Sequence, residues 1–174
     1  GYNGTASGTL IVADTDQGGS YAFELGTTTD NVTLPANIGV DGSSYSVSMW
    51  LNNSQTNPSG VANWFGGWNS GFDNSNLFIY QYQTNLRAYD SNAGGSVLIH
   101  EWSSSPVNTW KHVTVIADVN AGEYRTYLDG VLTATTPTAT DISGKSVYNW
   151  GLGYKSGAQV AALGMADDIR VYDR

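Results

Sequence analysis

Short runs in which apolar and polar residues alternate recur along this chain, and they constrain its fold more than any other feature. In the run Tyr45–Asn52 (YSVSMWLN), every second residue is apolar and shares one side: Val47, Met49 and Leu51. A period of two is the signature of a β-strand with one buried face. Helical spacing of apolar residues is nearly absent, and Gly157–Ala166 is predicted to be a loop. The chain is therefore predicted to be all-β.

Turn signals separate these runs. Asp129-Gly130 lies between two apolar runs and predicts a hairpin, because both central residues of such a turn must tolerate positive φ. There is no alternation of strands with helices and no linker that splits the chain. We therefore expect one domain over residues 1–174, folded as a two-sheet sandwich or jelly roll. The expected strands are 9–13, 20–25, 31–34, 45–52, 76–82, 85–89, 96–102, 110–118, 123–128, 131–135, 146–154 and 169–172.

Composition excludes several classes of partner. The formal net charge is −8 with only seven Lys and Arg residues, which argues against nucleic acid and against an anionic membrane surface. The chain has no Cys, so a disulfide framework and a thiolate metal site are excluded. No signal peptide or membrane span is visible. We expect a monomeric module from a larger exported protein, secreted or on the cell surface, of bacterial origin.

Four segments in order resemble one family: YAFELGTTTDNVTLP (Tyr21–Pro35), YSVSMWLN (Tyr45–Asn52), the stretch Asn108–Leu132, and the closing GMADDIRVYDR (Gly164–Arg174). Together they are similar to the laminin-G-like, concanavalin-A-like lectin/glucanase superfamily. This resemblance implies a concanavalin-A-like jelly-roll β-sandwich of two antiparallel sheets. It does not imply one function, because the superfamily contains lectins, adhesion modules, glycoside hydrolases and polysaccharide lyases.

A catalytic array is not visible in the sequence. Retaining glucanases of this fold need carboxylates at close spacing on one strand, as in E-x-D-x-x-E. Glu occurs only at positions 24, 101 and 123, and none has a carboxylate two or four residues away. His100 could lie near Arg87 and Tyr89, which leaves a lyase-like site open. We expect a non-catalytic protein.

A sugar site needs an aromatic ring that stacks on the C–H face of the sugar and polar side chains that bond its hydroxyls. One candidate is the Gly- and Asn-rich stretch 63–76, predicted to be a loop, with Trp64 and Trp68 as a stacking platform and Asn69 and Asp73 as polar partners. The alternative is that this loop tucks its aromatics over the edge of the sandwich. Trp50 and Trp110 are interpreted as core residues of the family motifs.

The second candidate is a concave groove on one sheet face. Strand alternation predicts that three neighbouring strands direct polar and aromatic side chains to one surface: Tyr80, Tyr82, Arg87, Tyr89, His100 and Trp102. Trp150 and Tyr154 could border this groove together with Lys155. The alternative is that these aromatics face the core. Arg87 and Lys155 could meet an acidic sugar or bond neutral hydroxyls.

The resemblance also implies a structural calcium near the closing strand. Asp167 or Asp168 would contribute ligands, together with Asp30 or nearby carbonyls, and the alternative is ordinary turn chemistry without metal. The preferred function is a carbohydrate-binding module that binds a polysaccharide or oligosaccharide. The alternatives are an adhesion module of a bacterial surface protein, which binds a protein or a cell-surface glycan, and a polysaccharide lyase or glycoside hydrolase.

Overall fold

The structure is a computed structural model, and it describes residues 5–8, 10–12, 21–34, 44–56, 58, 60–68, 77–92, 95–104, 107–137, 139, 149–153 and 160–173. All regular structure in these ranges is β-strand. The strands are β1 Thr5–Ser7, β2 Leu10–Val12, β3 Ala22–Leu25, β4 Asn31–Leu34, β5 Tyr45–Asn53, β6 Val61–Trp68, β7 Leu77–Tyr82, β8 Asn85–Asn92, β9 Gly95–Trp102, β10 Trp110–Asp118, β11 Glu123–Leu128, β12 Val131–Pro137, β13 Asn149–Leu152, β14 Val160–Ala161 and β15 Gly164–Asp173.

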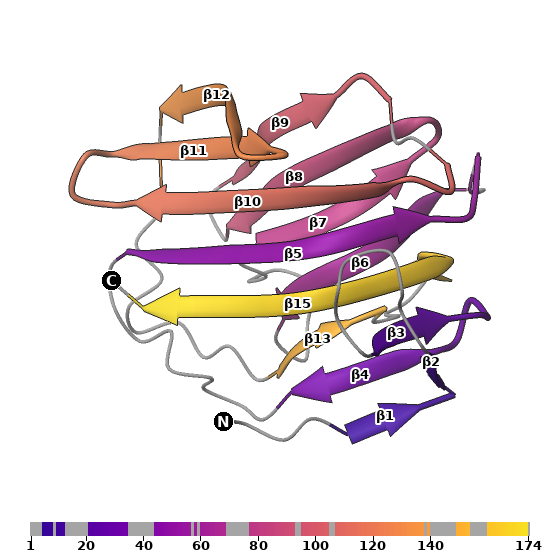
Figure 1. The fold of residues 1–174 in the computed structure, drawn as a ribbon. Coiled ribbons are helices and arrows are strands. Elements are labelled where there is room, and N and C mark those ends of the chain that lie inside the picture. The colour runs from indigo at the N-terminus through magenta and orange to yellow at the C-terminus, as the bar shows by residue number, and fades with distance from the viewer. Residues whose placement is uncertain are drawn as a thin grey trace.

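Two sheets lie face to face, as Figure 1 shows. The eight-stranded sheet has the order β1-β4-β13-β6-β7-β8-β9, and the short β14 pairs with β6 in parallel. The seven-stranded sheet has the order β12-β11-β10-β5-β15-β3-β2. All other strand pairs are antiparallel. The predicted antiparallel sandwich is therefore confirmed.

The core fills the space between the sheets. On β5, the alternation predicted from the sequence holds, since Val47, Met49 and Leu51 are buried and pack against residues of the opposite sheet such as Phe65 and Ile79. Burial of these apolar side chains supplies the main free energy of folding, at about 25 cal/mol per Å² of apolar surface.

Strand β6 corrects the predicted loop 63–76 over residues 63–68, and the rest of that prediction lies outside the described residues. Its glycines are used for close packing rather than for a flexible turn. A Cβ atom on Gly67 would lie 2.8 Å from the Trp150 ring, and one on Gly66 would lie 2.5 Å from the Phe78 ring. The glycines thus make room for aromatic rings on both faces of the eight-stranded sheet, and they do not mark a break in the strand.

The closing strand also differs from expectation. It begins at Gly164 rather than at Ile169. The predicted loop over residues 157–166 is therefore wrong at residues 160–161 and 164–166, which are strand. The register against β5 shifts between Asp167 and Arg170, and Asp168 has φ of 47°. These two features define a β-bulge, which lets one long strand contain the Asp-Asp pair. In the described part of the chain, no helix is long and apolar enough to cross a membrane.

Candidate functional site

The outer surface of the eight-stranded sheet carries a cluster of aromatic and charged side chains, named here the tyrosine face: Tyr80, Tyr82, Arg87, Tyr89 and Glu101. Leu77, Ile79 and Gln81 occupy alternate positions of β7, have no exposed surface and lie on the inner side. Tyr80 and Tyr82 therefore lie on the outer side. Cross-strand partners point the same way, and the register pairs Tyr80 with Arg87 and Arg87 with Glu101.

The side chains of the tyrosine face contact one another in order across the strands. The guanidinium carbon of Arg87 lies 4.5 Å from the centroid of the Tyr82 ring, and Arg87 also forms an ion pair with Glu101. The rings of Tyr80 and Tyr89 meet edge to face, with centroids 6.1 Å apart. Such contacts hold rings in a fixed orientation.

Exposure differs among these residues. Tyr82, Arg87, Tyr89 and Glu101 are half-buried, whereas only 8% of Tyr80 is exposed. Burial raises the pKa of Tyr80, so its hydroxyl is neutral at physiological pH. The hydrogen bond from Arg87 lowers the pKa of Glu101, which keeps that carboxyl ionised. The tyrosine face thus presents ring surface beside a compensated pair of opposite charges.

His100 and Trp102 do not belong to this surface. The predicted groove of six residues is therefore wrong for these two. The register pairs His100 with Ala88 and Trp102 with Leu86, and both partners are buried on the inner side of the sheet. The indole Nε1 of Trp102 donates to Oγ1 of Thr133 on the opposite sheet at 3.1 Å. His100 meets the Trp102 ring edge to face at 4.9 Å.

The reason for this split is a register shift in β9. Between Ala88 and Tyr89 the pairing skips Ile99, so Leu98 points outward beside Tyr89 and His100 points inward. The lyase-like set of His100 with Arg87 and Tyr89 is therefore not formed. His100 and Trp102 instead line a hollow of about 270 Å³ at the end of β9, whose other residues are Glu101, Ser103, Ser104 and Leu128. Burial lowers the pKa of His100.

The tryptophans expected in binding surfaces are mostly buried. Trp64 on β6 has no exposed surface, and Trp150 on β13 is 1% exposed and stacks on Phe65 at 5.6 Å between centroids. Neither ring can offer a face to a sugar, so both predictions are wrong. The side chain of Trp68 and the residues Asn69, Asp73, Tyr154 and Lys155 lie outside what the structure describes, and their predicted roles stay predictions.

Trp50 was predicted to be a core residue, and that prediction is wrong. It is half-buried on the outer side of the seven-stranded sheet, and its ring centroid lies 5.0 Å from that of His112. Trp110 was also expected in the core, but it is half-buried on the same outer side as Trp50. Its cross-strand partner is Asn52, which lies two residues after Trp50 and therefore on the same side of β5. The signal was present in the alternation of β5, where Trp50 shares its phase with Ser48 rather than with the apolar residues.

The three aspartates predicted to bind calcium have other partners. Asp30 is buried and accepts the backbone N–H groups of Gly26 (2.8 Å) and Thr27 (2.9 Å) and the Thr27 hydroxyl (2.6 Å). The Thr27 hydroxyl lowers the pKa of this carboxyl, with the two backbone donors adding to the effect. Asp167 accepts the N–H of Asp168 at 2.7 Å.

Asp168, in turn, pairs with Arg170 at 2.7 Å. No group of three or more acidic or His side chains that could hold a metal occurs among the described residues. Asp30, Asp167 and Asp168 therefore do not fit as one ligand set. Calcium binding stays a prediction from the resemblance.

Solved structures of similar fold include one domain of an extracellular arabinanase and the binding domains of botulinum neurotoxins. Domain 4 of AbnA, a GH43 extracellular arabinanase from Geobacillus stearothermophilus solved in complex with arabinotriose, matches 96% of this chain and 76% of its own, with a TM-score of 0.74 and 18% identity. The binding domain of botulinum neurotoxin serotype G matches all of this chain with a TM-score of 0.75 and 14% identity.

The binding domain of serotype D covers 99% of this chain at a TM-score of 0.74 and 17% identity. This chain spans less than half of either neurotoxin domain, at 44% of each. At these identities the likeness shows the fold alone. Comparison with curated protein sequences found no relative.

A family model described as the concanavalin A-like lectin/glucanases superfamily matches residues 25–174. This range includes all strands from β4 to β15 and therefore both sheets of the sandwich. The chain belongs to the concanavalin A-like lectin/glucanases superfamily.

Proposed function

We propose that this protein is a non-catalytic carbohydrate-binding module that holds a polysaccharide against the tyrosine face. The observation that carries the proposal is the arrangement of Tyr82, Arg87 and Glu101, where a partly exposed ring lies beside a donor and an acceptor. A sugar ring stacks on aromatic carbon with its C–H face and uses its hydroxyls for hydrogen bonds at the rim. The tyrosine face supplies both kinds of contact on one rigid sheet.

The charges of this surface favour an uncharged sugar. Arg87 would attract a uronate or a sulfate if its guanidinium were free, but it is already paired with Glu101 and stacked on Tyr82. An anionic sugar would also meet the ionised Glu101 carboxylate. Neutral hydroxyls can instead accept from Arg87 and donate to Glu101 without separating the pair.

The same pair supports a binding role over a catalytic one. A glycoside hydrolase needs two carboxyl groups flanking the scissile bond, one of which is protonated as the general acid. Glu101 is the acidic member of the tyrosine face, and Arg87 lowers its pKa. It is thus ionised at neutral pH and already hydrogen-bonded, which suits an acceptor better than a proton donor.

We further propose that the module acts outside the cell as one part of a larger protein. Support comes from the arabinanase neighbour, which is the fourth domain of an extracellular enzyme. A module of this kind keeps its parent protein close to a polymeric substrate, and weak single sites gain avidity through repetition. Calcium is a separate proposal: if it binds, the thermal midpoint of EDTA-treated protein rises when calcium is added.

The test is retention on neutral polysaccharides, including arabinan, xylan and mixed-linkage β-glucan, in native affinity gels. We expect retardation by at least one neutral polymer without release of products. Tyr82→Ala should remove it, whereas Tyr21→Ala should not, because Tyr21 is an exposed tyrosine (63%) outside the tyrosine face. Unchanged retention of Tyr82→Ala, or product release by the purified module, would overturn the proposal.

A further inference from the structure

The outer surface of the seven-stranded sheet carries a second arrangement of aromatic and polar side chains. Trp50 lies on β5, the middle strand of this sheet. The register places His112 directly opposite on β10 and Asp167 directly opposite on β15. Cross-strand partners share a side, so His112 and Asp167 flank the indole of Trp50 from both neighbouring strands.

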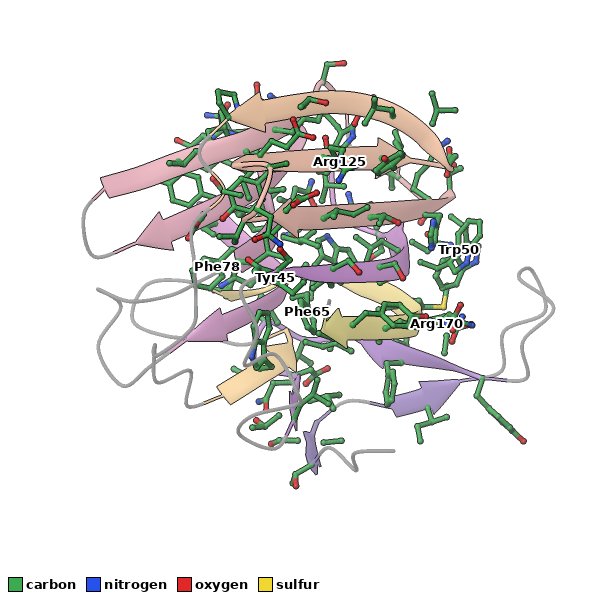
Figure 2. All side chains as sticks on the ribbon, turned by 90° about the vertical axis from the view of Figure 1, so that its left-hand side faces the viewer. Tyr45, Trp50, Phe65, Phe78, Arg125 and Arg170 are labelled. Atoms are coloured by element: carbon green, nitrogen blue, oxygen red, sulfur yellow. The ribbon has the colours of Figure 1, made fainter. Side chains whose placement is uncertain are left out.

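This surface and the tyrosine face lie on opposite sides of the sandwich. Figure 2 shows Trp50 and Arg170 projecting on one side of the molecule and Phe78, a neighbour of the tyrosine face on β7, on the other. Between them lies the buried core, which includes Phe65. A ligand seated at Trp50 therefore contacts none of the residues proposed above.

The charges around Trp50 leave one carboxylate without a cation. Lys111 pairs with Asp129 at 2.6 Å, and Arg170 pairs with Asp168 at 2.7 Å. Asp167 forms no ion pair with any residue that the structure describes, and its Oδ1 accepts the N–H of Asp168. A half-buried carboxylate beside a half-buried indole is a good acceptor for a polar ligand and repels an anionic one.

The backbone at this point is distorted as well. Asp168 is a non-glycine residue with φ of 47°, and it lies inside the bulge that follows Asp167. Left-handed backbone at such a residue costs free energy, and bulges re-aim the side chains next to them. Asp168 forms its ion pair with Arg170 within this bulge, and Asp167 comes directly before the distorted residue.

We propose that Trp50, His112 and Asp167 form a second binding site, which takes an uncharged sugar ring. The indole of Trp50 stacks on the C–H face of the sugar. Asp167 accepts hydrogen bonds from adjacent hydroxyls, and the imidazole of His112 donates or accepts one from the opposite edge of the ring. With one site on each broad face, a single module can join two polysaccharide chains.

The test follows the indole N–H signal of Trp50 by ¹⁵N NMR, assigned through its loss in Trp50→Phe. The probes are arabinotriose, xylotriose, cellotriose and, as the anionic control, trigalacturonic acid. At least one neutral trisaccharide should shift this signal to saturation, and trigalacturonic acid should not. Asp167→Asn and His112→Ala should each weaken binding of the neutral probe about tenfold, which corresponds to about 1.4 kcal/mol, because each removes one polar partner of the sugar hydroxyls.

The controls separate this site from the tyrosine face. Tyr82→Ala and Tyr21→Ala should leave the titration of the Trp50 signal unchanged. The thermal midpoint of every variant should stay close to that of the wild type, which shows that the variant is folded. A Trp50 signal that no neutral probe moves overturns the second site, whatever happens at the tyrosine face. A response of Trp50 that disappears in Tyr82→Ala also overturns it, because the two surfaces would then not be independent. Precipitation of a long neutral polymer by wild type but not by Asp167→Asn would support it.

Discussion

Arg87 and Glu101 are direct cross-strand partners on β8 and β9, and their side chains form an ion pair on the outer surface of the sheet. Tyr82 lies on the neighbouring strand β7, and the guanidinium carbon of Arg87 is 4.5 Å from the centroid of its ring. The guanidinium is therefore held by two contacts, and its charge is compensated before any ligand arrives. This relationship makes Glu101 a determinant of which sugars the tyrosine face accepts.

Replacing Glu101 by Gln should change the preferred class of sugar. The amide keeps a hydrogen-bond acceptor for Arg87 but removes the negative charge, so the guanidinium becomes available to a uronate. We expect the affinity for polygalacturonate, relative to a neutral polymer, to rise about tenfold, which corresponds to about 1.4 kcal/mol. Affinity gels with each polymer measure the ratio. Glu24→Gln, on the other sheet, is the matched control and should leave the ratio at the wild-type value.

Asp30, in the turn between β3 and β4, should make the free energy of unfolding depend on pH in the acid range. Its carboxylate accepts three hydrogen bonds, and its folded-state pKa is lowered, first by the Thr27 hydroxyl. The unfolded carboxyl titrates near pH 4, so this stabilisation is complete above that value and is lost as the pH falls through the folded-state pKa. Asp30→Ala should lower the free energy of unfolding at pH 7 by about 1–3 kcal/mol. Urea unfolding from pH 7 to pH 2 should show a shallower acid loss in the variant.

Gly67→Ala should destabilise the protein, although replacing Gly by Ala usually stabilises a protein by reducing the conformational entropy of its unfolded chain. The added methyl would lie 2.8 Å from the buried indole of Trp150, which cannot move without disturbing Phe65. Overpacking of this kind costs about 1–3 kcal/mol. Gly26→Ala is the matched control, because its methyl would meet only the Asp30 carboxylate at 3.8 Å. Equal thermal midpoints for the two variants would contradict the packing described for β6.

Local alternation predicted most of the fold, and it failed where the backbone departs from regular pairing. Strand β5 follows a simple period of two, and the β11–β12 hairpin has a clear Asp-Gly turn. Both were predicted nearly to the residue, although the register of the hairpin shifts between Thr126 and Tyr127. Strand β6 was taken for a loop because its glycines serve aromatic rings contributed by β7 and β13. Those rings are distant in sequence, so no local pattern records them.

The candidate site was predicted in part for the same reason. Tyr80, Tyr82, Arg87 and Tyr89 share a face because β7 and β8 pair without irregularity. The single skipped residue in β9, Ile99, turns His100 and Trp102 inward, and a one-residue slip reverses every side chain beyond it. Such a slip depends on the pairing partner and on the packing of Trp102 against Thr133, which only the folded structure provides.

Trp102 points inward, so we expect it to stabilise the fold by linking the two sheets rather than to stack on a ligand. These two roles predict different effects of mutation. Trp102 is 5% exposed, and its indole N–H bonds to the Thr133 hydroxyl of the opposite sheet. Trp102→Phe keeps an aromatic ring in the core but removes that bond, so we expect a loss of about 1 kcal/mol in the free energy of unfolding. Retention on neutral polysaccharide should stay at the wild-type level in the same variant. Thr133→Val removes this acceptor together with the hydrogen bonds that the Thr133 hydroxyl makes to the carbonyl and hydroxyl of Thr126, so it should be destabilised by more than Trp102→Phe and should bind equally well. Weakened binding in both variants, with stability unchanged, would instead return Trp102 to the ligand-binding surface.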